Sequence, residues 1–286
     1  MELTLPGDKL GLVLKLGLYI FFAVLGLALF PIMLEPLAGY FIASALGTFA
    51  ASAVANTLVV RIFERGALAT IGMNWHPGSL RNLLLGVLGG IGAGCIVLLG
   101  PLAAGIAQLE AAPNQPASAS SLLLVTILLI FGAVGEEMLF HGYAFQLLVG
   151  RIGPFATILP ISLLFGMAHL GNLHVTTIGF INTCGFGLVL GYACYRSGDL
   201  WLPIGIHFGW NWMMPLFGVN LSGFTMGVTG VTMHWKVADI WSGGQYGPEG
   251  SLLTCGVVVA LMVYLVKAPV FSQPIALAGP PPEERQ

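Results

Sequence analysis

Residues 121–149 read SLLLVTILLIFGAVGEEMLFHGYAFQLLV, and this stretch decides the fold class. It is long enough to cross a bilayer, because a spanning helix needs about 20 predominantly apolar residues. It nevertheless carries Glu136, Glu137 and His141 near its middle. A charged group at membrane depth costs about 2.5–3.5 kcal/mol on insertion scales. The stretch is therefore predicted to be a membrane helix with a polar site inside the membrane.

Seven further apolar stretches accompany this one and indicate a membrane protein. The 286-residue chain is 57% hydrophobic and only 8% charged, with a mean hydropathy of +0.91, whereas soluble domains carry about 25% charged residues. We predict an all-α, polytopic bundle of about eight transmembrane helices. Their expected ranges are 10–30, 38–63, 82–107, 121–149, 154–170, 175–195, 201–218 and 251–268.

The organisation along the chain follows from these ranges. Residues 1–120 are expected to hold the first three helices and their loops, and residues 121–218 a core of helices four to seven. Residues 219–250 are expected to form a long external loop, and residues 251–286 the last helix and a disordered cytoplasmic tail that ends in PPPEERQ. No soluble domain is expected.

The basic residues predict the orientation of the chain. With eight spans, nine of the ten lysines and arginines fall on the side of the termini, and only Lys236 falls on the other. Basic residues gather in cytoplasmic loops of membrane proteins. We therefore predict a multi-pass protein of a bacterial inner membrane with both termini in the cytoplasm.

Composition also excludes some functions. The net charge of −2 offers no basic surface for nucleic acid, so no such partner is expected. The four cysteines lie in apolar stretches without CxxC spacing and are predicted to be core residues. They are Cys95, Cys184, Cys194 and Cys255.

Polar side chains on later helices are spaced so that they can face a common cavity. His169 closes the fifth stretch, and His207 and Asn211, four residues apart, share one face of the seventh. Gly205 and Gly209 lie on roughly the opposite face, where small residues allow close helix packing. The seventh helix can therefore press its glycine face on a neighbour and present His207 and Asn211 to a cavity.

The two glutamates are expected to face different ways. Glu137 lies one helical turn from His141, while Glu136 projects to another face. Counting 1.5 Å per residue places His207 roughly 10 Å closer to the cytoplasmic end than Glu136. Tilted or interrupted helices are needed to bring these side chains together.

Three short motifs in this order resemble those of a known family. They are Glu136-Glu137-x-x-x-His141, Phe165-x-x-x-His169 and His207-x-x-x-Asn211. This pattern resembles the CPBP family, which contains the type II CAAX prenyl endopeptidases and the bacteriocin-immunity-related Abi proteins. The resemblance covers about 121–215, and SGGQYGPEGS (242–251) is similar to a segment of many bacterial members. The family usually has Arg where this chain has His141.

The resemblance implies an intramembrane endopeptidase with its catalytic core at 121–218. It assigns Glu136 and His169 to the activation of water, and His207 and Asn211 to the stabilisation of the oxyanion. The remaining motif residues would support these groups, namely Glu137, His141 and Phe165. The expected partners are a membrane-bound peptide or protein substrate and the lipid bilayer.

Two questions remain open from the sequence. Glu136, His169 and His207 could instead bind Zn²⁺ as three ligands with a fourth position for water, so the cofactor is none or Zn²⁺. The function could also differ. A proton- or ion-coupled transporter could use the same buried groups, and the replacement of Arg by His141 would suit a non-catalytic immunity or scaffold protein.

Overall fold

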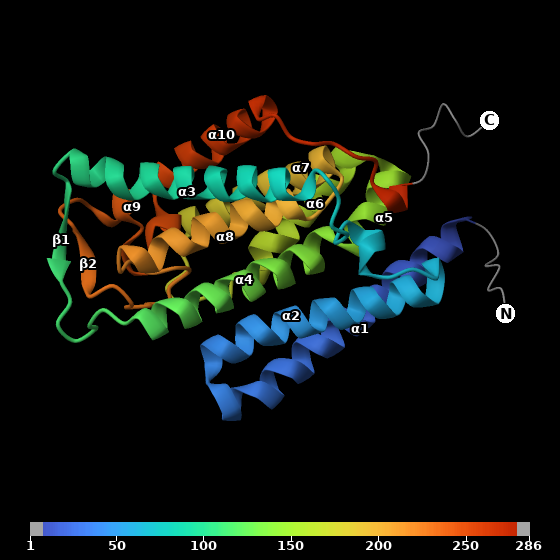
Figure 1. Ribbon diagram of the computed structural model, residues 1–286, viewed down its shortest axis with the longest axis horizontal. Helices are drawn as coiled ribbons and strands as arrows, with labels where there is room; N and C mark the ends of the chain where they lie inside the picture. The colour runs from blue at the N-terminus through green and yellow to red at the C-terminus, as the bar shows by residue number, and fades with distance from the viewer. Residues whose placement is uncertain (1–7, 279–286) are drawn as a thin grey trace.

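The computed structural model describes residues 8–278 as a bundle of helices aligned mainly along one long axis (Figure 1). A π-helical turn at Val60–Glu64 continues α2. The helices are α1 (Asp8–Ala38), α2 (Tyr40–Val59), α3 (Ser79–Ala103), α4 (Ala119–His141), α5 (Tyr143–Ile152), α6 (Pro154–Ala168), α7 (Thr177–Ser197), α8 (Trp201–Leu216), α9 (Asp239–Ser242) and α10 (Leu252–Lys267).

This is a polytopic helical membrane protein. Within residues 8–278, five helical stretches are long and apolar enough to cross a membrane: Lys9–Ala38, Tyr40–Glu64, Ser79–Ala103, Ala119–Ile152 and Thr177–Ser197. Each of the eight predicted segments contains helix, but α6, α8 and α10 have only 15, 16 and 16 residues. They are shorter than the roughly 20 residues of a full span.

Glycines allow α3 and α8 to pack closely. A Cβ atom added at Gly86 would lie 2.3 Å from the carbonyl oxygen of Leu202, and one added at Gly205 would lie 2.4 Å from that of Leu83. Close approach of two backbones through small residues is a common way for membrane helices to associate. The predicted packing role of the glycine face of α8 agrees with this contact.

The predicted single helix at 121–149 is wrong in one respect, because it breaks at Gly142 into α4 and α5. Asn56 of α2 bonds both sides of the break: its Nδ2 donates to the carbonyl of Met138 at 3.0 Å, and its Oδ1 accepts from the amide of Tyr143 at 2.9 Å. These are backbone groups that the interrupted helix leaves without partners. A side chain 82 residues earlier in the chain therefore stabilises the break.

The structure also contains a small sheet that the sequence did not predict. Strands β1 (Ala107–Ala111) and β2 (Val231–Trp235) pair antiparallel, with Ala107 opposite Trp235. Residue 107 was expected to end a helix, and 219–250 to be a loop. Figure 1 shows this sheet at one end of the molecule, which we call the sheet end. The opposite end holds α5 and the start of α1.

The tail beyond α10 is ordered over part of its length. Residues 269–278 return along the end opposite the sheet, where Ile275 is buried and the amide of Gln273 donates to the carbonyl of Ser197 at 3.0 Å. The predicted disorder therefore does not apply to residues 269–278. Its remaining part, 279–286, lies outside the described residues.

Candidate active site

The side chains singled out from the sequence come from three helices that meet near the middle of the bundle. Glu136 and Glu137 lie on α4, His169 caps the C-terminus of α6, and His207 and Asn211 lie on α8. The expected mismatch in depth does not keep them apart, since His207 Nε2 lies 3.9 Å from Glu136 Oε2. The tight turn that leads into α8 makes this possible.

That turn is held by a buried aspartate. Gly198 adopts φ 72°, a left-handed conformation that favours glycine. Asp199, which is fully buried, accepts a hydrogen bond from the amide of Trp201 at 3.0 Å. It also contacts His76 Nε2 at 2.9 Å. The chain at the start of α8 is therefore buried against protein at Asp199 and Leu200.

Glu137 links two histidines. Its Oε2 accepts from His141 Nδ1 at 2.7 Å, and its Oε1 accepts from His207 Nδ1 at 2.8 Å. Glu137 and His141 are fully buried, and His207 is nearly so. Because Nδ1 of His207 is engaged by the carboxylate, its Nε2 is the atom left to face the cavity. Glu137 thereby fixes the orientation of the ring.

Glu136 faces the other way, as predicted, and points toward two imidazoles. Its Oε2 lies 3.6 Å from His169 Nε2 and 3.9 Å from His207 Nε2. These distances exceed a direct hydrogen bond, and Oε2 is buried without a hydrogen-bond partner among the described residues. Nδ1 of His169 donates to the carbonyl of Phe165 at 2.8 Å, so Nε2 is again the atom that faces Glu136.

Phe165 packs against both histidines. Its ring centroid lies 4.7 Å from that of His169 and 6.1 Å from that of His207. On another side it meets Phe140 edge to face at 5.0 Å. The ring is 3% exposed, so it limits the movement of the two imidazoles. The supporting role predicted for Phe165 is compatible with these contacts.

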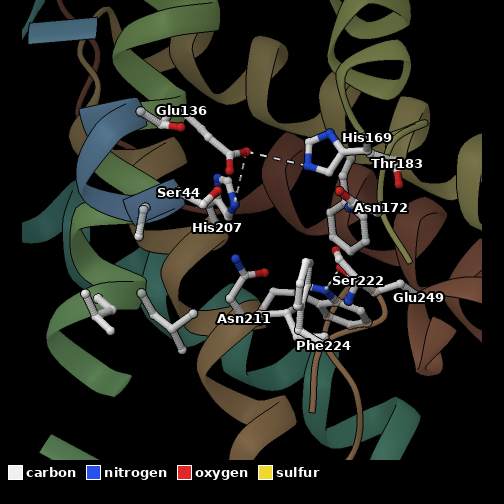
Figure 2. Close-up of a pocket in the computed structure, with 18 of the residues that line it drawn as sticks. Ser44, Glu136, His169, Asn172, Thr183, His207, Asn211, Ser222, Phe224 and Glu249 are labelled. Carbon is white, nitrogen blue, oxygen red and sulfur yellow. Dashed lines mark hydrogen bonds and ion pairs between the residues drawn. The ribbon is translucent and has the colours of Figure 1, made fainter. Parts of the chain in front are cut away.

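One cavity of about 160 Å³ contains these groups. It is lined by Glu136, Phe165, His169, His207 and Asn211 together with residues from α2 and from the loops at the sheet end. Figure 2 shows Glu136 and His169 facing each other across it, with His207 near Glu136 and Asn211 projecting from the same side as His207. The polar groups of three helices thus share one pocket.

Comparison with known proteins identifies the family of the segment that carries these side chains. Residues 118–213 match the family model described as type II CAAX prenyl endopeptidase Rce1-like. Residues 118–213 are an Rce1-like domain. It belongs with the CPBP and Abi proteins. Neither the curated proteins nor the solved structures contain a match to this chain.

The pocket extends beyond the Rce1-like domain. Residues of the domain supply Glu136, His169, His207 and Asn211, whereas Tyr40, Ser222, Phe224 and Glu249 lie outside 118–213 and line the same cavity. The rings of Tyr40 and Phe224 stack at 5.7 Å between centroids. This contact joins the start of α2 to the segment that follows α8.

Sequence reasoning missed the carboxylate of Glu249. Its Oε2 accepts from the amide and hydroxyl of Ser222 at 2.6 and 2.8 Å, and its Oε1 accepts from Trp210 Nε1 at 3.3 Å. Asn182 donates to its backbone carbonyl at 2.7 Å. The motif SGGQYGPEGS contains this glutamate and was the available signal, but nothing in its spacing showed that it reaches the pocket.

Tyr246 in the same loop is fully buried. Burial, together with the negative charge of nearby Glu249, raises the pKa of the Tyr246 hydroxyl to about 12. The neutral phenol is therefore the stable form of this side chain throughout the physiological range.

The alternative of a zinc site at Glu136, His169 and His207 gains no support from this geometry. Within residues 8–278, no group of three His, Cys, Asp or Glu side chains is arranged as the ligands of a metal ion. Glu136, His169 and His207 line the cavity of the Rce1-like domain, where Glu136 Oε2 faces the Nε2 atoms of the two histidines. No reaction step is therefore assigned to a metal.

Proposed function

We propose that this protein is an intramembrane endopeptidase that hydrolyses a peptide bond of a membrane-associated substrate. The observation that supports it most strongly is the convergence of Glu136 Oε2 with the Nε2 atoms of His169 and His207 in one cavity. Family membership of residues 118–213 supports the same class of enzyme. A hydrolase needs an activated water, a stabilised oxyanion and a proton for the leaving amine.

In this proposal, Glu136 and His169 bind and activate the water. Glu136 Oε2 has no competing hydrogen bond among the described residues, so it is free to accept a proton from water. His169 is oriented by the carbonyl of Phe165 and presents Nε2 to the same point. The attack forms a tetrahedral intermediate, and the protonated Glu136 then gives its proton to the leaving amine.

His207 and Asn211 would stabilise the oxyanion. To donate to it, His207 must carry a proton on Nε2 as well as on Nδ1, and the Glu137 carboxylate 2.8 Å away balances that charge. Asn211, one turn further on α8 and lining the same cavity, supplies a neutral N–H donor. Donors that are already oriented stabilise developing charge at little reorganisation cost.

The histidine at position 141 is compatible with this chemistry. The proposed role of the family's usual Arg is to hold Glu137, and His141 Nδ1 does so at 2.7 Å. The departure from the family pattern therefore preserves a donor to the carboxylate that orients His207. This contact favours a catalytic protein over a scaffold that has kept only the fold.

The proposal includes a topology. We propose that residues 121–218 form the catalytic core and that the chain crosses a bacterial inner membrane eight times with both termini in the cytoplasm. The five long apolar stretches support a multi-pass protein, and the distribution of Lys and Arg supports the orientation.

Purified protein in proteoliposomes, incubated with a mixed peptide library and analysed by mass spectrometry, tests the activity. Glu136→Gln is isosteric and removes the base, so cleavage should disappear while the melting temperature stays near that of the parent. Glu35→Gln, an exposed substitution of the same type on α1, is the matched control and should cut normally. Normal cleavage by Glu136→Gln would contradict the assignment of the base.

A further inference from the structure

One side of the cavity is lined by polar residues at the sheet end of the molecule. Tyr40 is the first residue of α2, Asn172 lies in the loop between α6 and α7, and Ser222 and Glu249 lie in the segment between α8 and α10. All four line the cavity, and all four lie in or beside connections at the sheet end. In Figure 2, Ser222, Phe224 and Glu249 lie to the right of Asn211, and all four lie below Glu136.

The opposite side of the cavity is closed by packed protein. Directly beyond Glu136 along the chain, Glu137, His141, Tyr143 and Phe145 are all fully buried. Tyr143 OH donates to Glu64 Oε1 at 2.8 Å, which closes this layer against the end of α2. On the other side, the polar residues Tyr40, Asn172, Ser222 and Glu249 line the cavity at the sheet end.

The distribution of Lys and Arg assigns each end of the molecule to one side of the membrane. Among residues 8–278, eight lysines and arginines lie at the end opposite the sheet, which we call the basic end, and only Lys236 lies at the sheet end. The eight are Lys9, Lys15, Arg61, Arg65, Arg81, Arg151, Arg196 and Lys267. Such an excess marks the cytoplasmic side of a membrane protein.

We propose that the active-site cavity opens to the non-cytoplasmic side of the membrane. The substrate is then a peptide whose scissile bond is presented from that side, such as the outer juxtamembrane segment of a membrane-anchored or exported polypeptide. The nature of the substrate rests on the proposed endopeptidase function. The direction of opening rests on the position of the cavity and on the basic residues, and it can be tested without activity.

Cysteine accessibility tests the direction of opening. In a variant whose four native cysteines are replaced by alanine, Ser44→Cys places a thiol at an exposed residue of the cavity lining. Ala67→Cys places one at an exposed residue of the basic end. A membrane-impermeant maleimide should label Ser44→Cys in spheroplasts and lose that labelling in sealed inverted vesicles. Ala67→Cys should show the reverse.

Ala111→Cys in β1 is a matched control for the sheet end, because it is exposed and remote from the cavity lining. It should label with the same sidedness as Ser44→Cys. Labelling of Ser44→Cys from the cytoplasmic side alone, or from neither side, would overturn the proposal.

A second measurement separates access from catalysis. A peptide that the purified enzyme cuts is placed beside a single membrane anchor in both orientations, and cleavage is expected only where it lies on the non-cytoplasmic side. Cleavage of the cytoplasmic version would overturn the proposal. If Ser44→Cys is labelled as expected but the purified enzyme cuts no peptide at all, the assigned opening is supported and the endopeptidase function is contradicted.

Discussion

The two oxygens of Glu137 each accept one imidazole hydrogen bond, from His141 and from His207. A carboxylate offers two acceptor oxygens, whereas an amide offers one acceptor and one donor group. The side chain does not line the cavity. It therefore acts through His207, as a positioning residue that keeps Nε2 directed at the reacting groups.

Glu137→Gln should separate this role from substrate binding. The amide leaves one histidine without its acceptor, so His207 loses its fixed tautomer and orientation. In metal sites, loss of a partner that orients a histidine typically costs 10- to 100-fold in activity, and we expect a loss of the same order here. We expect kcat to fall by about that factor with KM little changed, measured on a peptide that the parent enzyme cuts. A rise in KM with unchanged kcat would contradict the positioning role.

The raised pKa of Tyr246 predicts that the stability of the protein depends on pH at high pH. Its folded-state pKa of about 12 exceeds the value of about 10 in an unfolded chain. The contribution of Tyr246 to the free energy of unfolding is therefore complete below about pH 10. It falls by about 2–3 kcal/mol as the pH rises toward 12. Tyr246→Phe should lose less thermal stability than the parent between pH 9 and 12. Parallel stability curves for the two proteins would contradict this assignment.

The sequence predicted part of the site through helical spacing. Glu137 and His141 are four residues apart and do form a hydrogen bond, and Glu136 does point elsewhere. Spacing within a helix could not predict the bond between Glu137 and His207, which are 70 residues apart. That bond depends on where α8 starts, and Asp199 and the turn before it set that start. The catalytic roles themselves remain predictions.

At the scale of the elements, α3 and α8 depend on glycine for their contact. Lipid tails are as apolar as the side chains, so the hydrophobic effect does not drive helices together inside a membrane. Close packing through small residues stabilises their contact instead. Gly86 lies against the carbonyl of Leu202 and the backbone of Gly205, neither of which can rotate away. Gly92, on the same helix, has open space around its Cβ position. The two positions form a natural pair for comparison.

Gly86→Ala should therefore destabilise the protein, and Gly92→Ala should not. Overpacking typically costs about 1–3 kcal/mol, while alanine is the better helix former by about 1 kcal/mol where space permits. Thermal unfolding in one detergent measures both variants. Equal melting temperatures for the two variants would show that α3 and α8 separate without cost.

Long apolar runs were sufficient to predict the main helices, but shorter features were not predictable. The break at Gly142 lies inside an apolar run, and its stability comes from Asn56 on another helix. Strands β1 and β2 have five residues each, and residues 112–230 separate them in the chain. Neither carries a local pattern strong enough to distinguish a strand from a loop, because the pairing is made by distant residues.

At the scale of the molecule, the basic end is closed by segments that are distant in the chain. Asp199 lies between His76 Nε2 and Asn82 Nδ2, at 2.9 and 2.8 Å. Asn82 also holds the tail, since it accepts from the amide of Phe271 and donates to its carbonyl, both at 2.9 Å. The Pro-containing tail suggested disorder, but one buried amide supplies the partners that its irregular backbone needs.

Asn82→Ala should release the tail and loosen the basic end. The substitution leaves the amide and carbonyl of Phe271 without partners and removes a donor from buried Asp199. Lost bonds to buried groups cost about 1–3 kcal/mol each, so the melting temperature should fall. Trypsin should then cut faster after Lys267, which is exposed just before the tail.

Arg81→Gln, an exposed change at the preceding residue, should keep the parent rate of cleavage after Lys267. Mass spectrometry of the released C-terminal fragment measures that cleavage in inverted vesicles, where the basic end is expected to face the protease. If Asn82→Ala and Arg81→Gln were cut at the same rate, the tail would be held by the burial of Ile275 rather than by Asn82. The proposed substrate path lies at the sheet end. Normal cleavage of a peptide substrate by Asn82→Ala would therefore show that the two ends of the molecule act independently.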